Sequence, residues 1–275
     1  MAILKHDSSL RKRLKQSQSL GVLKLLPSFL RGSIRGETWK DTILEEHQTA
    51  NLNQLSCNSH NPLRTYFDSI TEGRGIWKWL HYFDIYHRHF QKFVGKEVRV
   101  VEVGIYSGGS LDMWKAYFGP RCLVYGVDIK EACKVYEDER TRVFIGDQSD
   151  RDFWKKFREQ VPKIDVLIDD GGHMAEQQIV TLEETLPYMR PGGVYLCEDI
   201  VGTQNRFAAY MNGLGAALNA FEQKGVSEAR VIPEPFQRAI YSVHLYPFVA
   251  VIEKACHPVQ EFCGPKHGSK WQPFL

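Results

Sequence analysis

The amino-acid sequence predicts an α/β fold: a Rossmann-like, doubly wound and mostly parallel sheet that ends in an antiparallel hairpin. Three observations predict it. From residue 98 onward, short apolar runs alternate with segments of helical composition, acidic residues follow the end of each run, and two strand-like runs near residue 247 are joined only through Pro247. Alternating strands and helices indicate a parallel sheet covered by helices, whereas so short a connection requires antiparallel pairing.

The chain begins with a basic arm. The 275 residues carry a formal net charge of +2, yet residues 1–40 hold nine Lys and Arg against Asp7 and Glu37. The arm is therefore about +7 and the remainder about −5. Because the arm is Ser-rich and contains the apolar run Leu20–Leu26, three interpretations stay open: a transit peptide, a helix on a membrane surface, or a solvated tail. We expect a basic extension and polar linker over 1–62 and a folded domain over 63–275.

Composition excludes several classes of protein. No stretch reaches the roughly 18 to 20 apolar residues of a membrane span, and the acidic remainder offers no basic stripe for nucleic acid. The six cysteines contain no C-x-x-C pair, which excludes a zinc ribbon and indicates a reduced compartment. We expect a cytoplasmic protein, with organellar targeting by residues 1–37 as an alternative.

The predicted elements follow from local patterns. Ile76, Leu80, Phe83 and Phe90 have helical spacing after the turn residues at 73 and 75, which predicts one helix over 76–90. Continuous apolar runs indicate strands that are buried on both faces. The predicted strands are Val98–Val103, Cys122–Asp128, Thr141–Ile145, Ile164–Ile168 and Gly193–Cys197, with a helix through Leu111 and Phe118 after the first and a hairpin of Tyr241–Tyr246 and Phe248–Glu253 at the end.

Acidic residues gather where these strands end. In an open parallel sheet the ligand site lies beyond the carboxyl ends of the strands, so these side chains should meet at one edge. The acidic residues at or just after the five predicted strand ends are Glu102, Asp128, Asp147, Asp169, Asp170, Glu198 and Asp199.

The turn after the first strand indicates a nucleoside site. Its glycines Gly104 and Gly108 lack G-x-G-x-x-G spacing, but Asp128 lies 24 residues beyond Gly104, the separation at which a carboxylate reaches ribose hydroxyls. The alternative is that Asp128 only caps the turn. Since Glu102 and Asp169 would repel a pyrophosphate and suit a cationic amino-acid group, S-adenosylmethionine is favoured over NAD.

The second acidic cluster indicates a metal. Asp169, Asp170, Glu198 and Asp199 would repel one another unless some are protonated, basic side chains neutralise them, or a divalent cation binds. Oxygen ligands favour Mg²⁺ or Mn²⁺. His173 follows three residues after Asp170 and is a candidate general base near neutral pH.

The motifs that carry these residues are Val101-Glu-Val-Gly-Ile-Tyr-Ser-Gly-Gly-Ser-Leu-Asp-Met-Trp114, Gly146-Asp-Gln148, Ile168-Asp-Asp-Gly-Gly-His173 and Pro191-Gly-Gly-Val-Tyr-Leu-Cys-Glu-Asp199. The sequence from about Ile76 to Glu253 resembles class I S-adenosylmethionine-dependent methyltransferases and, more narrowly, the metal-dependent macrolide sugar O-methyltransferases of the mycinamicin type. It departs from that family at Ile200-Val-Gly-Thr-Gln-Asn205, which affects the acceptor pocket.

The resemblance implies a role for each matching residue. It implies Mg²⁺ (or Mn²⁺) held by Asp170, Glu198 and Asp199, and His173 as the base. The residues that it implies for binding S-adenosylmethionine are Glu102, Gly104, Tyr106, Ser107, Gly108, Asp128, Asp147, Gln148 and Asp169.

The expected function is a Mg-dependent O-methyltransferase in natural product biosynthesis that acts on a hydroxyl of a small molecule: a sugar, a vicinal diol or another natural-product acceptor. We expect a homo-oligomer without a nucleic-acid partner, with peripheral membrane contact through the arm as an open alternative. An NAD-dependent oxidoreductase, a relative of the cephalosporin hydroxylases and a non-catalytic binding relative remain alternatives on the same sheet.

Overall fold

The computed structural model describes residues 19–38, 61–202, 204–220 and 230–269. The chain forms two compact units, Met1–Leu55 and Ser56–Leu275. Helix α2 (Ser19–Thr38) belongs to the first unit, and its Leu26, Phe29 and Leu30 are each about half exposed. Within the described ranges, no helix is both long enough and apolar enough to cross a bilayer.

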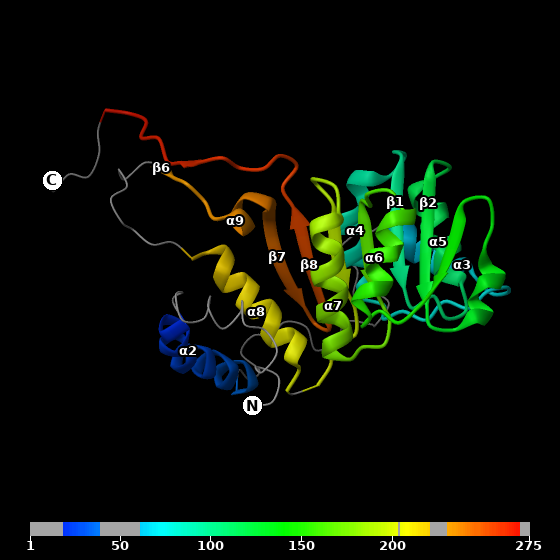
Figure 1. Cartoon of the computed structure of the whole chain (residues 1–275), viewed down its shortest axis with the longest axis horizontal. Coiled ribbons are helices and arrows are strands. Elements are labelled where there is room, and N and C mark those ends of the chain that lie inside the picture. The colour runs from blue at the N-terminus through cyan, green and yellow to red at the C-terminus, as the bar shows by residue number, and fades with distance from the viewer. Residues whose placement is uncertain (1–18, 39–60, 203, 221–229, 270–275) are drawn as a thin grey trace, which may run out of the picture. The chain divides into compact units, whose positions relative to one another are not determined.

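A seven-stranded sheet forms the centre of the second unit, in the order β3-β2-β1-β4-β5-β8-β7 (Figure 1). Strands β1 to β5 run parallel, whereas β8 runs antiparallel to both β5 and β7. The strands are β1 (Val98–Val103), β2 (Cys122–Asp128), β3 (Thr141–Ile145), β4 (Val166–Asp169), β5 (Val194–Cys197), β7 (Ile240–Tyr246) and β8 (Val249–Lys254). Strands β6 (Arg230–Val231) and β9 (Phe262–Cys263) form a separate antiparallel pair. The predicted fold class, including the terminal hairpin, is confirmed.

Helices cover both faces of the sheet. One face carries α3 (Pro62–Ser69), α4 (Tyr82–Phe90) and α5 (Gly109–Phe118). The other carries α6 (Arg151–Gln160), α7 (Ala175–Thr185), α8 (Arg206–Leu218) and α9 (Pro235–Ala239). Short 3₁₀ helices η3 (Gln91–Phe93), η4 (Glu131–Tyr136) and η5 (Leu186–Tyr188) lie between these elements.

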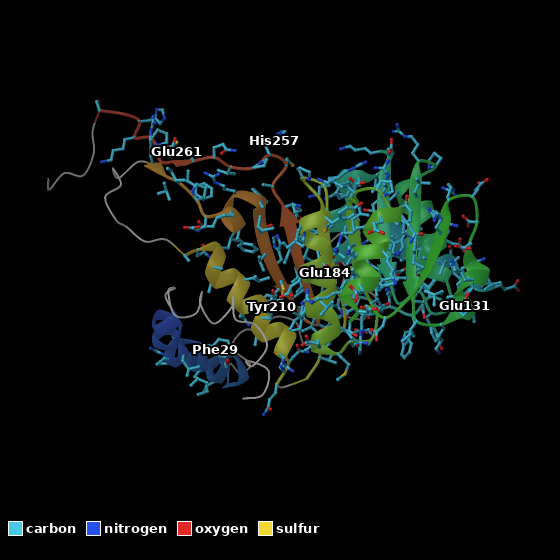
Figure 2. All side chains as sticks on the ribbon, in the orientation of Figure 1. Phe29, Glu131, Glu184, Tyr210, His257 and Glu261 are labelled. Carbon is cyan, nitrogen blue, oxygen red and sulfur yellow. The ribbon has the colours of Figure 1, made fainter. Side chains whose placement is uncertain are left out.

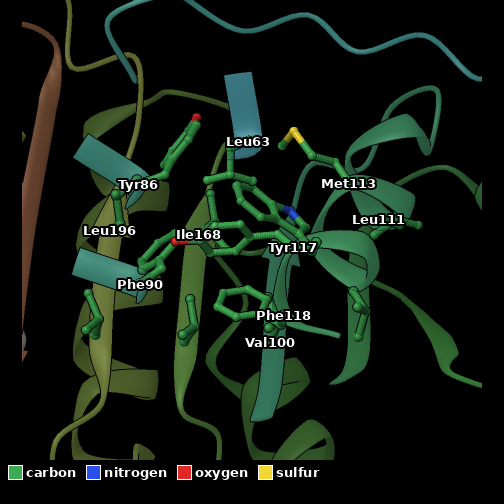
Figure 3. Close-up of a cluster of buried hydrophobic side chains, with 14 of the residues drawn as sticks. Leu63, Tyr86, Phe90, Val100, Leu111, Met113, Tyr117, Phe118, Ile168 and Leu196 are labelled. Atoms are coloured by element: carbon green, nitrogen blue, oxygen red, sulfur yellow. The ribbon is translucent and has the colours of Figure 1, made fainter. Parts of the chain in front are cut away.

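Aromatic side chains fill the first core. Tyr86 and Phe90 of α4 stack with their ring centroids 6.0 Å apart, and both rings contact Trp114 of α5 edge-on. Figure 3 shows Tyr86 and Phe90 in one cluster with the strand residues Ile168 and Leu196. Burial of one such side chain contributes about 2 to 3 kcal/mol, so α4 is firmly attached to the sheet.

The second core lies under α6, α7 and α8. Trp154 and Phe157 of α6 are fully buried in one cluster with Val101 and Tyr195 from the sheet's other face. Tyr210 of α8, labelled in Figure 2, donates a hydrogen bond to Glu183 Oε1 of α7 (3.0 Å). These two cores fix the strand ends, and hence the candidate site, from both sides.

The single helix predicted over residues 76–90 is wrong in its first half. Helix α4 begins only at Tyr82, and residues 75–79 have no regular secondary structure. The apolar spacing is compatible with a helix. In the structure, however, the Lys78 side chain lies at the acidic strand ends, where its ammonium group donates hydrogen bonds to Asp170 and Glu198. Pairing a buried charge changes the free energy by more than the small difference in helix propensity, so the pairing of Lys78 decides the local conformation.

The first helix of the second unit has a well-formed N-terminus. Pro62 occupies its first turn, and the Asn61 side chain accepts hydrogen bonds from Leu63 N (3.1 Å) and Arg64 N (3.3 Å). Asn61 also donates to Asp84 of α4 (3.1 Å), and Leu63 is fully buried. These contacts join the residues on both sides of position 62 to the second unit, and the expected division into 1–62 and 63–275 stays a prediction.

Candidate active site

The candidate site lies where the strand order reverses. The chain runs outward from β1 through β2 to β3 and then returns to the opposite side of β1 with β4. Ligands of doubly wound sheets bind at this point. Here the two loops touch: Gly104 has a φ of 81°, and a Cβ at Gly104 would lie 2.0 Å from the backbone oxygen of Asp170. Only glycine allows this approach.

The turn after β1 is tied to β2. Asp128 Oδ2 accepts hydrogen bonds from Ile105 N (3.2 Å) and Tyr106 N (3.3 Å), while its Oδ1 accepts one from Lys130 N (2.9 Å). Asp128 therefore caps this turn, and ribose binding would require it to share or exchange these contacts. Ser107 and Gly108 complete the turn, and Gly108 lies in the left-handed region before α5.

Two of the residues expected to bind S-adenosylmethionine, Asp147 and Gln148, follow β3. Gln148 is buried, donates to Asp169 Oδ1 (2.9 Å) and accepts from Gly172 N (2.7 Å). Asp147 is exposed, and its Oδ1 accepts from Ser149 N (2.8 Å). Asp147 is thus accessible to a ligand, whereas the Gln148 side chain holds the loop that carries the second acidic cluster.

A buried lysine neutralises part of the acidic cluster. Lys78 Nζ lies 2.6 Å from Asp170 Oδ2 and 3.0 Å from Glu198 Oε2, and its side chain is only 3% exposed. Its distance to Glu102 Oε1 is 3.6 Å. The sequence left three ways to compensate the carboxylates: protonation, a basic side chain or a divalent cation. The structure contains the basic side chain, but its single ammonium group faces three carboxylates.

Burial and charge oppose each other in this cluster. Burial alone would lower the pKa of Lys78, but Glu198, Asp170 and Glu102 raise it well above its ordinary value. Burial likewise raises the pKa of Glu102, of Glu198, and of Asp169, the last to about 6. Glu102 Oε1 is buried without a hydrogen-bond partner. A cationic ligand would oppose this effect of burial and stabilise the charged form of these carboxylates.

Asp199 and His173 face each other beyond β4 and β5. Asp199 Oδ1 accepts hydrogen bonds from Tyr82 Oη (2.7 Å) and Trp79 Nε1 (3.1 Å). Its Oδ2 lies 3.8 Å from His173 Nε2. Burial and the hydrogen bond to Asp199 raise the pKa of Tyr82, so this hydroxyl stays protonated as a donor.

A candidate cation site is formed by Asp170, His173 and Asp199, which are three of the four residues predicted to bind the metal or act as the base. Donor atoms of Asp170, His173 and Asp199 all lie within 4.8 Å of one another. Two carboxylates with open positions fit Mg²⁺, which keeps several waters. Glu198 is adjacent, but Tyr86 Oη donates to it (2.6 Å) and Lys78 pairs with it, so Glu198 is already engaged.

The sequence reasoning missed four residues that shape this site: Lys78, Trp79, Tyr82 and Tyr86. All four were assigned to an amphipathic helix. The sequence contains one feature that could have pointed to Lys78: it is a single lysine within the otherwise apolar run Ile76-Trp-Lys-Trp-Leu80, in a chain whose strand ends carry many acidic residues. That feature does not say which carboxylates the lysine meets.

Comparison with known proteins agrees with this geometry. Residues 101–200 match a family described as a methyltransferase domain. The chain is 32% identical over 201 residues to mycinamicin VI 2''-O-methyltransferase of Micromonospora griseorubida, covering 64% of this chain and 48% of that protein. It is 37% identical over 147 residues to demethylmacrocin O-methyltransferase of Streptomyces fradiae, covering 50% and 35%. The chain spans about half the length, or less, of these curated relatives.

A solved structure shares the fold. The MycE methyltransferase from the mycinamycin biosynthetic pathway, solved in complex with Mg and S-adenosylhomocysteine, is 28% identical with a TM-score of 0.57. The match covers 71% of this chain and 53% of that chain. Together with the matched family and the sheet order, it shows that this chain contains a class I S-adenosylmethionine-dependent methyltransferase domain, which is similar to that of MycE.

Proposed function

We propose that this chain transfers the methyl group of S-adenosylmethionine to a hydroxyl of a sugar or another small molecule with vicinal hydroxyls, and that the reaction requires Mg²⁺ or Mn²⁺. The observation that carries this proposal is the meeting of Asp170, Asp199 and His173 at the switch point of the sheet, with donor atoms within 4.8 Å. The curated relatives named above support it, because they are O-methyltransferases by name.

The turn after β1 would hold the cofactor. Glu102 and Asp169 supply buried negative charge for its amino group and sulfonium, and Asp128 with Tyr106, Ser107 and the glycines of the turn would face the nucleoside. Glu102 Oε1 accepts no hydrogen bond, although Lys78 Nζ lies 3.6 Å away, and this supports the assignment because a buried carboxylate oxygen without a donor is costly.

Asp170 and Asp199 would hold the divalent cation, with Glu198 beside them. When bound, the cation supplies a Lewis acid that makes the acceptor hydroxyl more acidic. Tyr82 and Trp79 fix the orientation of the Asp199 carboxylate, and Tyr86 with Lys78 fixes that of Glu198.

His173 would act as the general base. Its side chain is partly exposed beside Asp199, where an acceptor hydroxyl can approach it. His173 takes the proton that the acceptor hydroxyl loses as its oxygen bonds to the methyl carbon and the carbon–sulfur bond breaks. Because the methyl group moves directly, no covalent intermediate with the protein is needed.

Calorimetry and a methyl-transfer assay on the full chain test this function. S-adenosylmethionine should bind, whereas NAD and 2-oxoglutarate should not; the opposite result would favour an oxidoreductase or a hydroxylase. With a panel of methyl glycosides as acceptors, chelation should abolish transfer and added Mg²⁺ or Mn²⁺ should restore it.

Three variants assign the roles. Asp170→Asn and Asp199→Asn should lose the response to metal while the sheet stays folded. His173→Ala should keep cofactor binding but lose about 10²- to 10⁴-fold in turnover, the range for removal of a general base. The exposed His257, labelled in Figure 2, provides the matched control His257→Ala, which should transfer at the wild-type rate. Full activity of His173→Ala, or activity that survives chelation, would refute this mechanism.

A further inference from the structure

Strained backbone in the described chain gathers at one edge of the sheet. Four non-glycine residues there have a positive φ: Tyr106 (43°), His173 (56°), Asp199 (53°) and Phe248 (64°). Such a conformation costs an L-residue about 1 to 3 kcal/mol and is retained mainly where a ligand or reaction requires it. The first three residues already belong to the candidate site, whereas nothing assigns a role to Phe248.

Phe248 is held at the same edge. It lies in the connection between β7 and β8, next to the pair Tyr246 and Val249. The Phe248 carbonyl accepts a hydrogen bond from Ile200 N (3.0 Å), directly after Asp199. His81 Nε2 lies within hydrogen-bond distance of Pro247 O (3.1 Å). The strained turn is thus fixed on two sides, beside the end of β5.

Phe248 contacts a second exposed aromatic ring. The ring centroids of Phe248 and Trp79 are 5.7 Å apart with an interplanar angle of 51°. Trp79 is 53% exposed and Phe248 is 40% exposed, so neither ring serves the core. The Trp79 indole N–H is bonded to Asp199 Oδ1, which fixes the orientation of the ring relative to the reacting groups.

We propose that Trp79 and Phe248 form the acceptor-binding wall, which packs against the aliphatic C–H face of a sugar ring and directs its hydroxyl toward Asp199 and His173. Aromatic rings provide a broad apolar surface whose contacts with such a face are individually weak and collectively strong. The proposal rests on the proposed methyl transfer, and it adds a preference for a cyclic acceptor with an apolar face over an open-chain diol.

The test compares two probes on the full chain with S-adenosylmethionine and Mg²⁺: methyl α-L-rhamnopyranoside, which has a ring face, and propane-1,2-diol, which has vicinal hydroxyls only. Phe248→Ala should raise KM for the glycoside about tenfold and leave KM for the diol within about twofold. Trp79→Ala should raise KM for the glycoside by a similar factor and, because it also loses the bond to Asp199, should lower kcat for both probes. Calorimetric binding of the glycoside to protein loaded with S-adenosylhomocysteine should weaken by the same factor. Affinity for S-adenosylmethionine should not change.

Three further variants separate a binding role from a structural one. Trp77, two positions from Trp79, is 88% exposed, so Trp77→Ala should behave as wild type. Trp79→Phe keeps a ring and loses the bond to Asp199, so it should mainly lower kcat. Phe248→Gly relieves the left-handed strain, so it should keep or raise the melting temperature while the affinity for glycoside still falls about tenfold.

Failure of this proposal and failure of the proposed function are distinguishable. Wild-type KM and glycoside affinity in Trp79→Ala and Phe248→Ala would overturn the acceptor-binding wall even if methyl transfer occurs. Equal wild-type KM values for the glycoside and the diol would also overturn it. Absence of S-adenosylmethionine binding or of any transfer by the wild-type protein would instead overturn the proposed function, and the wall with it.

Discussion

Lys78 donates a hydrogen bond of 2.6 Å to Asp170 across 92 positions of sequence, and the same ammonium group bonds both oxygens of Glu198. The lysine comes from the irregular segment before α4, and the two acids follow β4 and β5. This contact attaches the segment that carries Trp79, and with it the start of α4, to the edge of the candidate site. It also orients the two side chains before a cation binds.

The first prediction concerns this lysine. Lys78→Met should lower the free energy of unfolding by about 3 kcal/mol or more, because removing one partner leaves buried charge uncompensated. Added Mg²⁺ should raise the melting temperature of the variant more than that of the wild type, since the cation then replaces the missing charge. Urea denaturation measures the free energy of unfolding, and thermal melts with and without Mg²⁺ measure the shift in melting temperature.

Lys115 provides the control for Lys78. Its side chain is also mostly buried, but its partners Asp112 and Asp138 are each about 40% exposed. Solvent screens those carboxylates, so Lys115→Met should cost clearly less than Lys78→Met. If the two variants are equally stable, Lys78 does not balance the acidic cluster.

The second prediction concerns Gly104. Gly104→Ala should destabilise the domain by about 3 kcal/mol or more, because the added Cβ would overlap the backbone of Asp170 in addition to the strain of a positive φ. Gly73 has a φ of 90° with no atom within 4 Å of a built Cβ, so Gly73→Ala isolates the strain alone, at about 1 to 2 kcal/mol. Thermal melts of the two variants should therefore differ, and equal melts would contradict the close contact of the two loops.

The third prediction concerns pH and a polar cluster between α4 and β8. His89 Nδ1 lies 2.5 Å from Glu253 Oε1, and Lys92 donates to Glu253 Oε2 (2.9 Å). The bond to His89 and the charge of Lys92, against the effect of burial, lower the pKa of Glu253 from 4.5 to about 2. A depressed carboxyl pKa contributes stability that is present above pH 4.5 and is lost as pH falls toward 2.

Glu253→Gln should therefore be less stable than the wild type at pH 6, and the difference should shrink as the pH is lowered from 4.5. Urea denaturation at several pH values checks this dependence. Glu97 forms a surface pair with Arg99 and is 59% exposed, so Glu97→Gln should change stability by less than about 1 kcal/mol at any of these pH values. A difference for Glu253→Gln that does not vary with pH would contradict the assignment.

The fourth prediction concerns the basic arm. Deletion of residues 1–37 should leave the second unit folded, since that unit contains the sheet, both cores and every residue of the candidate site. Circular dichroism and a thermal melt should show an unchanged transition, and methyl transfer should persist with a soluble acceptor. Loss of transfer with an unchanged melt would place the arm in the active site.

Vesicle flotation tests whether the basic arm is a helix that lies on a membrane surface. The exposed Leu26, Phe29 and Leu30 of α2 are spaced as neighbours on one side of a helix, as in helices that lie on membrane surfaces. A membrane-surface helix requires the full chain to float with vesicles that contain anionic lipid, and the truncated chain to remain behind. Equal behaviour of both chains would indicate a solvated tail or a targeting segment.

The sequence by itself determined the sheet and the place of the acids. Apolar runs such as Val98–Val103 and Cys122–Asp128 have the bounds that the structure gives them, because a strand buried on both faces must be apolar throughout. Parallel strands have their carboxyl ends at one edge, so the residues that follow them were predictable as neighbours. His173 beside Asp199 follows from the same geometry.

Only the tertiary structure decided how these acids are compensated. Lys78, Trp79 and Tyr82 fit a helical pattern locally, yet long-range charge and hydrogen bonding place the first two in an irregular segment at the site. Gln148 and Asp128, expected as ligand contacts, also tie loops together. Local periodicity reports which face of an element is apolar. It carries no information about which distant charges a buried side chain must satisfy, because that depends on the packed arrangement of the whole domain.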